Sequence, residues 1–432
     1  MSGSVREKHS EKGVSSGWLI ALCWLVYAFS YIGKLSYTAN VTQIEEYFSV
    51  QHSDAGAVTS FFFFAYGAGQ IINGLLCKKY PLRYVIFGAM AVSGIANLSI
   101  PLIPTGQFFW VKYIWMLNGL ALSVLWPSLI RLLSETLCEK DLSTANVVMG
   151  TTVCTGTFLT YGGSALFVGF GGFQAIFYVA AAISLAVAGA WFFAYPKLVT
   201  RNFVFAADQP AQGALMGSAP MQSSAVQSAR NGWFPMQMLP FLSVIAVLAV
   251  CNNLIKDGLT TWLPAILKET YDLPDWTSIL LTMLLPLLGV FAVVVATGIY
   301  KKIPNFFVEL VILYGVSGIL VCVVLGLLST NALAVTVGCF GIVAMLMSAV
   351  NGVITSMIPL YMREKLGNSG MIAGVLNGFC YVGSTISSYG LGALAEGSGW
   401  TAVFVLFIVL CAFSVLLGGA GAIVQRRKQD AR

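Results

Sequence analysis

Residues 17–41 read GWLIALCWLVYAFSYIGKLSYTANV, an apolar run whose single charged side chain is Lys34. A helix of about 20 mainly apolar residues is long enough to cross the hydrocarbon core of a bilayer. The run therefore predicts a transmembrane helix. Because an ammonium group in hydrocarbon is costly, a lysine inside such a helix normally faces a cavity or an oppositely charged partner, which makes Lys34 a candidate functional residue.

The rest of the chain has the same apolar character. Of its 432 residues, 58% are hydrophobic and 9% are charged, and the mean hydropathy is +0.83. Because the polar N-terminus leads directly into a full-length span, we expect no cleavable signal peptide. We predict an all-α membrane protein whose twelve transmembrane helices lie near residues 17–41, 54–77, 83–103, 107–134, 143–169, 172–195, 236–267, 276–300, 304–328, 332–361, 368–394 and 399–424.

The basic residues are distributed unevenly between the predicted loops. Nineteen of the 23 lysines and arginines fall at one set of helix ends. Since cytoplasmic loops are enriched in basic residues, we expect both termini to be cytoplasmic, in a multi-pass protein of the cell (cytoplasmic) membrane. The net charge of +6 comes from these loops and indicates no nucleic-acid partner. The opposite loops carry acidic residues, namely Glu45, Glu46, Asp54, Asp272, Asp275 and Glu396.

No pattern typical of an enzyme is visible. The sequence has no nucleotide-binding loop, ATPase motif or catalytic triad. Its nine cysteines are scattered without metal-ligand spacing, so we read them as packing residues and expect no metal and no cofactor. We expect a non-enzymatic protein, monomeric in the lipid bilayer, in which any transport is driven by gradients.

The two halves of the chain repeat one another. Cys77–Pro81 (CKKYP) corresponds to Tyr300–Pro304 (YKKIP), and Gly172–Phe177 (GFQAIF) corresponds to Gly399–Phe404 (GWTAVF). Six helices followed by six related helices form a parallel repeat about an axis normal to the membrane, which places a substrate site near the midplane between the halves.

The repeat also predicts the division into domains. The segment between the halves is rich in Ala, Gln, Ser and Gly and reads as a linker. The predicted units are a cytoplasmic N-terminal tail (1–16), a six-helix bundle (17–195), a cytoplasmic linker (196–234), a second six-helix bundle (235–424) and a cytoplasmic tail (425–432).

Lys34 has a counterpart in the second half. Lys256 lies in the seventh predicted helix, 222 positions after Lys34, and the repeat pairs the two lysines. Tyr27, Tyr31 and Lys34 are spaced i, i+4 and i+7, so they share one helix face, and Asn253 shares a face with Lys256. We expect these polar stripes to face the interior of the bundle.

Four further stretches carry a family resemblance. They are Ala65–Gly74 (AYGAGQIING), Trp126–Pro127 with Arg131, Ile255–Pro264 (IKDGLTTWLP) and Asn377–Gly383 (NGFCYVG). With the two-half organisation, they resemble the major facilitator superfamily and, more specifically, the organophosphate:phosphate antiporter family, which carries glycerol phosphate and hexose phosphates. The resemblance covers nearly the whole chain outside the linker. It implies the major facilitator fold, with two pseudo-symmetric six-helix bundles.

The resemblance also implies a set of binding residues. It places Tyr27, Tyr31 and Lys34 on two tyrosines and an arginine of that family. It places Lys256 on a second arginine, and Tyr381 on a binding tyrosine.

Four positions depart from the family pattern. Both arginines are lysines here, Gln70 stands in place of a binding lysine, and Cys154 stands in place of a histidine. An arginine binds phosphate bidentately, whereas a lysine acts as a compact point charge. These departures favour an anion less highly charged than a phosphate ester, such as a carboxylate or sulfonate.

Each candidate also has a structural alternative. Lys34 and Lys256 are structural charges if they pair with a carboxylate or carbonyl. Asp257 is the only evident deep carboxylate, and successive helix residues point about 100° apart. Asp257 itself is a proton-coupling group, a partner of a lysine, or a helix-packing residue.

The polar and aromatic candidates have packing alternatives. Trp126 and Tyr381 either line the site or pack as core aromatics. The tyrosines of the first helix, Gln70 and Asn253 either bind the ligand or bond neighbouring helices.

A set of basic residues is predicted to act at the cytoplasmic gate. Arg131 and Arg363 follow prolines at helix ends, and Lys78 stands where the superfamily usually has an aspartate. Lys79 and Arg83 lie in the same loop region as Lys78.

The sequence thus predicts a secondary transporter that carries a small organic anion (a carboxylate, sulfonate or phosphate ester) by alternating access. Anion exchange, with inorganic phosphate as a possible counter-ion, is the first mechanism. The alternatives are proton-coupled symport through Asp257, with the proton as co-ion, and a transporter-like membrane sensor of sugar phosphates.

Overall fold

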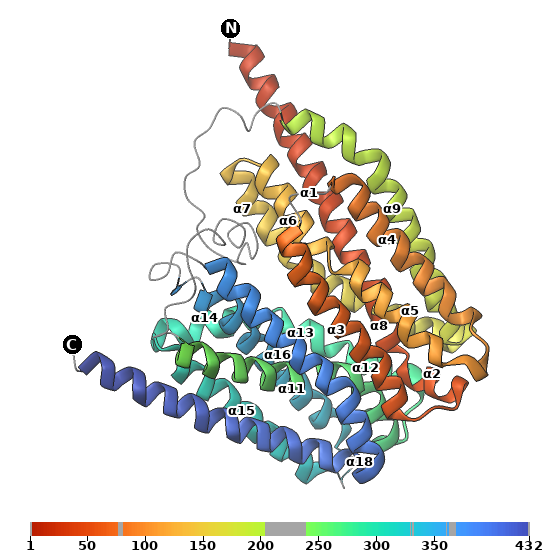
Figure 1. The fold of residues 1–432 in the computed structure, drawn as a ribbon, viewed down its shortest axis with the longest axis vertical. Helices are drawn as coiled ribbons and strands as arrows, with labels where there is room; N and C mark the ends of the chain where they lie inside the picture. Colours follow the sequence, from red (N-terminus) through yellow and green to blue (C-terminus); the bar gives the residue numbers. More distant parts are fainter. Residues whose placement is uncertain are drawn as a thin grey trace.

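The computed structural model describes residues 2–76, 81–203, 239–328, 330, 332–359, 361–362 and 369–430, which are helical apart from turns and short connections (Figure 1). In the first half the helices are α1 (Ser2–Ala39), α2 (Val41–Phe48), α3 (His52–Leu76), α4 (Leu82–Ser99), η2 (Ile100–Leu102), η3 (Thr105–Gln107), α5 (Phe109–Leu122), α6 (Leu125–Thr136), α7 (Glu139–Gly150), α8 (Thr152–Gly171) and α9 (Phe173–Phe203).

The second half is built in the same way. Its helices are α11 (Leu239–Tyr271), α12 (Asp275–Thr282), α13 (Leu284–Gly289), α14 (Ala292–Lys302), α15 (Phe306–Leu327), α16 (Leu333–Gly352), the π-helical turn η6 (Val353–Met357) and α18 (Ser369–Asp430). Figure 1 shows the two halves as two groups of helices that lean against each other, red to yellow-green and green to blue.

The predicted number of spans is confirmed. Eleven helical segments of the described chain are long and apolar enough to cross a membrane. The last of them, Ile372–Ile423, contains Gly399 in a left-handed conformation (φ 72°), which divides it into two crossings. A side chain is strained at such a φ, and glycine is not, so Gly399 provides the turn between the eleventh and twelfth spans.

Several spans that the hydropathy predicts as continuous are interrupted. The fourth divides into α5 and α6 just before Pro127, and the eighth divides into α12, α13 and α14 around Pro286. A proline lacks the backbone N–H and clashes with the preceding turn, which explains the break before Pro127 and the break between α12 and α13, three residues before Pro286. By contrast, α9 continues through Pro196 into the first residues of the predicted linker. Residues 204–238 lie outside the described part of the chain.

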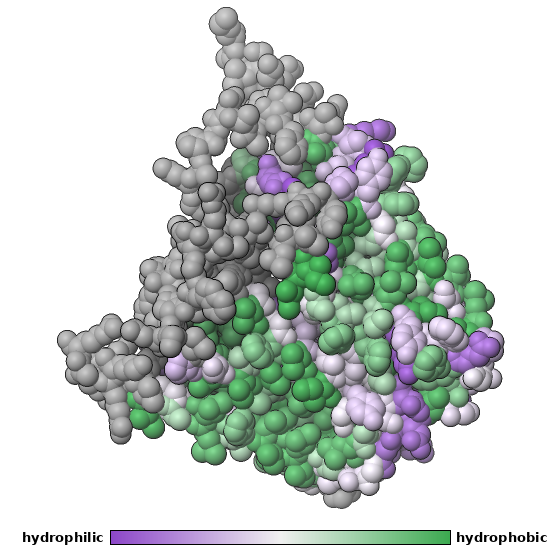
Figure 2. Space-filling view, viewed as in Figure 1, coloured by the Kyte–Doolittle hydropathy of each residue, from purple (hydrophilic) through white to green (hydrophobic). Residues whose placement is uncertain are grey.

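Apolar side chains cover the outside of the molecule, as expected of a protein solvated by lipid. Phe170 and Leu416 are 92% and 74% exposed. Figure 2 shows a broad apolar face, with polar residues gathered toward the edge where Figure 1 places α2. We call this edge, which holds α2, the start of α3 and the α11–α12 turn, the α2 end.

Within the first half, small and polar residues allow helices to approach closely. Asn97 of α4 and Asn118 of α5 both donate to the backbone carbonyl of Gly33 on α1, at 3.0 and 2.9 Å. A Cβ added at Gly119 would lie 2.6 Å from the carbonyl oxygen of Phe62 on α3. Such contacts dominate helix association in membranes, where lipid is as apolar as leucine.

The halves meet along α3 and α18, and along α8 and α12. Ser60 donates to the carbonyl of Thr385 at 2.6 Å, nearer the α2 end. Farther along the same pair of helices, Gly67 lies against Tyr381, where a Cβ would come within 2.8 Å of the tyrosine Cβ. These contacts bring the first crossing of α18, before Gly399, against the helices that carry the predicted site.

We expect Gly119→Ala to destabilise the protein by about 1–3 kcal/mol, because overpacking a filled contact costs this much. Gly88→Ala on α4 is the matched control, since nothing lies within 4 Å of a Cβ there. Thermal unfolding of both variants in one detergent measures the difference. Equal midpoints would contradict the close approach at Gly119.

Candidate functional site

Lys34 lies on α1 among aromatic rings. Its Nζ is 4.3 Å from the ring centroid of Tyr66 and 5.1 Å from that of Tyr31. The rings of Phe62 and Phe63 are 5.9 and 6.0 Å away. Ring faces attract a cation, although more weakly than a carboxylate does. Within the described chain, no carboxylate lies within 4.0 Å of this ammonium group, so it is free of an ion-pair partner there.

Lys256, on α11, is in a different situation. Its Nζ lies 2.8 Å from Oδ1 of Asp257, and the Ser384 hydroxyl on α18 donates to the other oxygen of the same carboxylate. Successive residues point apart on a helix, but the lysine stem is long enough to reach its neighbour. The side chains of Lys256 and Asp257 are 24% and 17% exposed, so solvent reaches both.

The two lysines belong to one electrostatic site. Lys34 lies within range of Coulomb interaction with both Lys256 and Asp257. Two ammonium groups and one carboxylate leave the site with a single positive charge while Asp257 is ionised. An electrically neutral site therefore needs one additional negative charge.

Aromatic side chains from several helices contact one another beside these charges. The rings of Tyr27 and Trp126 are 4.6 Å apart, and those of Tyr27 and Tyr31 are 5.6 Å apart. The rings of Tyr66 and Tyr381 are 5.2 Å apart. The structure thus brings together the predicted aromatic residues of α1, α6 and α18.

Tyr66 was missed by the sequence reasoning, although it is the ring nearest to Lys34. It lies within the quoted stretch Ala65–Gly74, four residues before Gln70 and therefore on the same helix face. That spacing was the signal that could have identified it.

The predicted amide residues make contacts between helices. Gln70 accepts a hydrogen bond of 2.8 Å from Asn377, which joins α3 to α18 and so one half to the other. Asn253 donates to Asn351 at 3.4 Å and to the carbonyl of Ala249 at 3.2 Å. Gln70 and Asn253 are 7% and 3% exposed.

The predicted gate residues are only partly described. Arg83 donates to the carbonyl of Phe192 at 3.0 Å and stacks on its ring, which holds α4 against α9 within the first half. Arg131 forms an ion pair of 2.8 Å with Glu135 one turn along α6. Lys78, Lys79 and Arg363 lie outside the described residues.

The sequence also missed a deep carboxylate. Glu309, in the first turn of α15, is fully buried. Among the described residues, neither of its carboxylate oxygens has a hydrogen-bond partner. Glu309 is thus a second carboxylate within the predicted spans, near the end of its helix.

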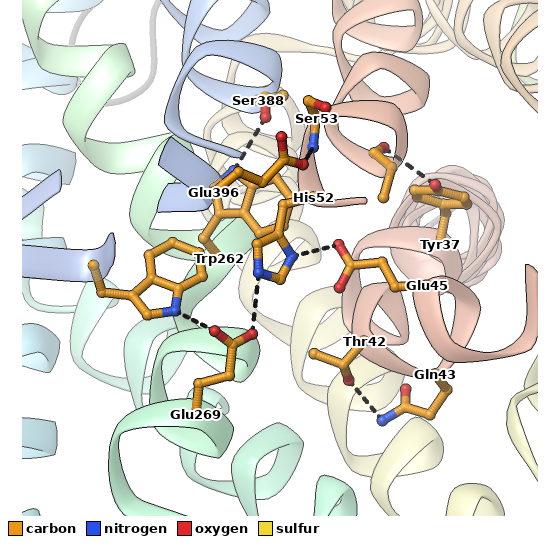
Figure 3. Close-up of polar contacts among 12 residues, drawn as sticks. Tyr37, Thr42, Gln43, Glu45, His52, Ser53, Trp262, Glu269, Ser388 and Glu396 are labelled. Atoms are coloured by element: carbon orange, nitrogen blue, oxygen red, sulfur yellow. Dashed lines mark hydrogen bonds and ion pairs between the residues drawn. The ribbon is translucent and has the colours of Figure 1, made fainter. Parts of the chain in front are cut away.

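A second polar cluster joins the halves at the α2 end (Figure 3). Lys268 of α11 forms ion pairs with Glu46 of α2 and, at 2.9 Å, with Asp275 of α12. His52 lies between Glu45 and Glu269, whose carboxylates come from opposite halves. The sequence placed the acidic residues at one set of helix ends, but their contacts depend on the packing of the two halves.

Comparison with known proteins supports a family of transporters. The voltage-gated purine nucleotide uniporter SLC17A9 of Rattus norvegicus is 27% identical over 233 residues, which are 52% of this chain and 48% of that protein. The membrane sensor protein UhpC of Escherichia coli (strain K12) is 26% identical over 102 residues, 23% of each chain. The chain thus aligns with about half the length of the first relative and a quarter of the second.

The fold has clear counterparts among solved structures. The crystal structure of a D-xylose-proton symporter superposes with a TM-score of 0.71 over 92% of this chain and 95% of that chain, at 11% identity. At this identity the likeness concerns the fold alone. The sequence pattern of the Major Facilitator Superfamily matches residues 23–388. Because that match spans most of the chain and the helices adopt the same fold, the protein belongs to the Major Facilitator Superfamily, a family of membrane transporters rather than enzymes.

Proposed function

We propose that the protein is a secondary active transporter of a small organic anion, which it carries by alternating access. The observation that carries this proposal is the deep Lys34, which has no ion-pair partner within the described chain and lies beside the Lys256–Asp257 pair. A deep charge without a partner is costly and marks a substrate or ion pathway. An anion bound at Lys34 supplies the missing charge.

The charge of the site sets the kind of anion that fits. With Asp257 ionised, the site has one excess positive charge and matches the monoanionic head group of a carboxylate or sulfonate. If Asp257 becomes protonated, Lys256 is released from its partner and the site matches a dianion such as a phosphate ester. A lysine contributes a point charge, whereas an arginine can form two parallel hydrogen bonds to one head group. The charge of the anion therefore matters more for binding here than the geometry of its head group.

The same charge balance favours exchange as the mechanism. A transporter must close its site before it opens to the other side. Closing an empty site would bury the Lys34 ammonium without a counter-charge, and desolvating an unpaired ion costs several kcal/mol or more. A bound anion removes that penalty. Net return of the empty protein is then slow, whereas exchange of one anion for another is fast.

Specific observations also support two other functions, proton symport and sensing. Asp257 touches both Lys256 and Ser384, so its protonation would change the site charge, as proton symport requires. A relative named as a membrane sensor supports a sensing role without transport. The predicted cytoplasmic placement of both termini, in the cell membrane, is part of the proposal for all three functions.

Replacement of Lys34 by glutamine is expected to weaken anion binding about 10- to 100-fold, because a hydrogen bond to a charged group contributes about 1.5–3 kcal/mol. Thermal-shift titration with lactate, methanesulfonate, AMP, glucose 6-phosphate and inorganic phosphate first identifies an anion that binds. Counterflow of that anion in proteoliposomes then measures transport.

Lys112→Gln is the matched control for Lys34→Gln. Lys112 also lies among aromatic rings near the end of an apolar helix, 4.2 Å from the ring centroid of Phe109, but outside the proposed site. We expect this variant to bind and transport normally. Normal counterflow by Lys34→Gln would rule out the proposed role of Lys34, and binding without counterflow in the unmodified protein would favour the sensor.

Asp257→Asn should change selectivity rather than abolish binding. The substitution raises the formal charge of the site from one to two, so the preference is expected to move several-fold from lactate or methanesulfonate toward AMP or glucose 6-phosphate. Competition in the same counterflow assay measures the ratio. Ser384→Ala, which leaves the charge unchanged, is the control, and an unaltered ratio in Asp257→Asn would count against the charge-matching argument.

An imposed pH gradient separates exchange from symport. Exchange predicts no concentrative uptake when an imposed pH gradient makes the external side acidic and the lumen holds no anion. Symport predicts concentrative uptake driven by that gradient, and loss of the response in Asp257→Asn. Uptake against a concentration gradient in the absence of internal anion would therefore contradict exchange and support symport.

A further inference from the structure

The imidazole of His52 connects the two halves of the protein at the α2 end. Its Nδ1 lies 3.0 Å from Oε1 of Glu45 on α2, and its Nε2 lies 3.2 Å from Oε1 of Glu269 on α11. Figure 3 shows the ring between the two carboxylates. Glu45 and His52 belong to the first half and Glu269 to the second, so this arrangement exists only while the halves are in contact here.

The geometry fixes how many protons the cluster holds. Each ring nitrogen lies 3.0–3.2 Å from a carboxylate oxygen, and at this distance a proton must lie between the two atoms because their lone pairs would otherwise repel. A neutral imidazole has one N–H, whereas these two contacts need two protons. The second proton makes His52 an imidazolium, or it resides on one of the glutamates. Either way, the closed cluster binds one proton more than a neutral histidine and two carboxylates.

The surroundings favour retention of that proton. Glu269 also accepts a hydrogen bond of 2.8 Å from Trp400, and the rings of Trp262 and Trp400 are each 5.4 Å from that of His52. The side chains of His52 and Glu45 are 20% and 9% exposed. Glu45 lies on α2, outside the membrane-spanning segments, and burial raises the pKa of its carboxyl.

Other charged groups of the α2 end are either neutralised or acidic. Lys268 forms ion pairs with Glu46 and Asp275. Glu396 of α18 accepts a hydrogen bond of 2.6 Å from the backbone N–H of Ser53. Asp54, in the first turn of α3, adds a further negative charge. Lys112 of α5 lines the same pocket as Asp54. The acidic groups of this part of the chain still outnumber the two lysines, which also favours a bound proton.

The cluster lies where movement of the halves would break it. A Cβ at Gly392 of α18 would be 2.7 Å from the carbonyl oxygen of His52, so the backbones of α3 and α18 touch at this level. Trp262 of α11 donates to the carbonyl of Ser388 on α18, 3.1 Å away, beside the cluster. If the halves separate at this end, Glu269 leaves with α11 and water reaches His52.

We propose that Glu45, His52 and Glu269 form a proton-binding site between the halves, which takes up one proton when the α2 end closes and releases one when it opens. The inference rests on the alternating access of the proposed function, but not on which anion is carried. With both termini cytoplasmic, the α2 end faces outward, so acid outside the cell would hold the outer gate closed.

The effect of pH on the equilibrium between the open and closed states has a defined sign and size. The closed state binds more protons, so lowering the pH stabilises it and raising the pH favours opening. An imidazole in water titrates near 6.5, so the open state lacks the extra proton above about that pH. One linked proton changes the open-to-closed ratio tenfold per pH unit, because the free energy changes by 2.303RT for each proton and pH unit. Below about pH 6.5 the dependence disappears.

Hydrogen–deuterium exchange of α2 and the start of α3 tests the proposal in the full-length protein in nanodiscs, without any transported anion. Exchange is followed from pH 6.0 to 8.5 and corrected for its intrinsic pH dependence. We expect the open-to-closed ratio to rise by up to tenfold for each pH unit above about pH 6.5. A flat profile in the unmodified protein would overturn the proposal, whatever the outcome of the transport experiments.

Three variants separate proton binding from a merely structural role. Glu45→Gln lets an amide N–H donate to Nδ1 of a neutral His52, so both hydrogen bonds persist with one imidazole proton. We expect α2 and the start of α3 to stay protected from exchange in this variant, while the dependence of opening on pH disappears. His52→Gln should lose the slope as well. Lys268→Gln should weaken closure at every pH but keep the slope.

The outcomes that oppose the proposal are equally specific. A slope like that of the unmodified protein in both Glu45→Gln and His52→Gln would show that the extra proton lies elsewhere. Loss of the slope in Lys268→Gln to the same extent as in His52→Gln would show that any loosening of the α2 end removes it, which would overturn a site-specific role.

Discussion

The site depends on the cost of keeping an ammonium group deep in a membrane protein. Lys34 has aromatic rings around it and no carboxylate within ion-pair distance in the described chain, whereas Lys256 is neutralised by Asp257. Cation–π contacts recover only part of the lost hydration. In the proposed function, this surplus positive charge is the reason for an anionic substrate, for a single negative charge on that substrate, and for the resistance of an empty site to closure. Anion selectivity and exchange, as proposed, would thus be two consequences of one electrostatic imbalance.

In the proposed transport cycle, the contacts between the halves link this imbalance to movement. Glycines on α3 and α18 let the two backbones touch, and hydrogen bonds such as Ser60 to Thr385 and Asn377 to Gln70 follow the same helix pair. At the α2 end, ion pairs and the His52 cluster add to these neutral contacts. Charged contacts at one end depend on pH and hydration, whereas close-packed glycines do not. Within the described chain, the α2 end is therefore a part of the interface that can respond to solution conditions.

Much of the architecture could be predicted from sequence because the bilayer imposes a simple length rule. Apolar runs of sufficient length correspond to the observed spans, and the repeat between the halves places Lys34 and Lys256 in equivalent helices. The breaks at Pro127 and Pro286 were less visible, since hydropathy averages over a proline that interrupts a helix. Tyr66 was within reach of a spacing argument, but Glu309 was not, because a single acidic residue near a helix end gives no sign of its burial.

The sequence by itself determined the elements that water and lipid select locally: the spans, their repeat, and the helix faces that carry Tyr27, Tyr31 and Lys34. Only the tertiary structure decided which charges are paired. Ser384 binds Asp257 from 127 positions away, and Asn377 reaches Gln70 across 307 positions. Glu45 and Glu269 approach His52 from different halves. Hydropathy and helical periodicity act over a few turns of one helix, whereas the balance of buried charge depends on which helices pack together.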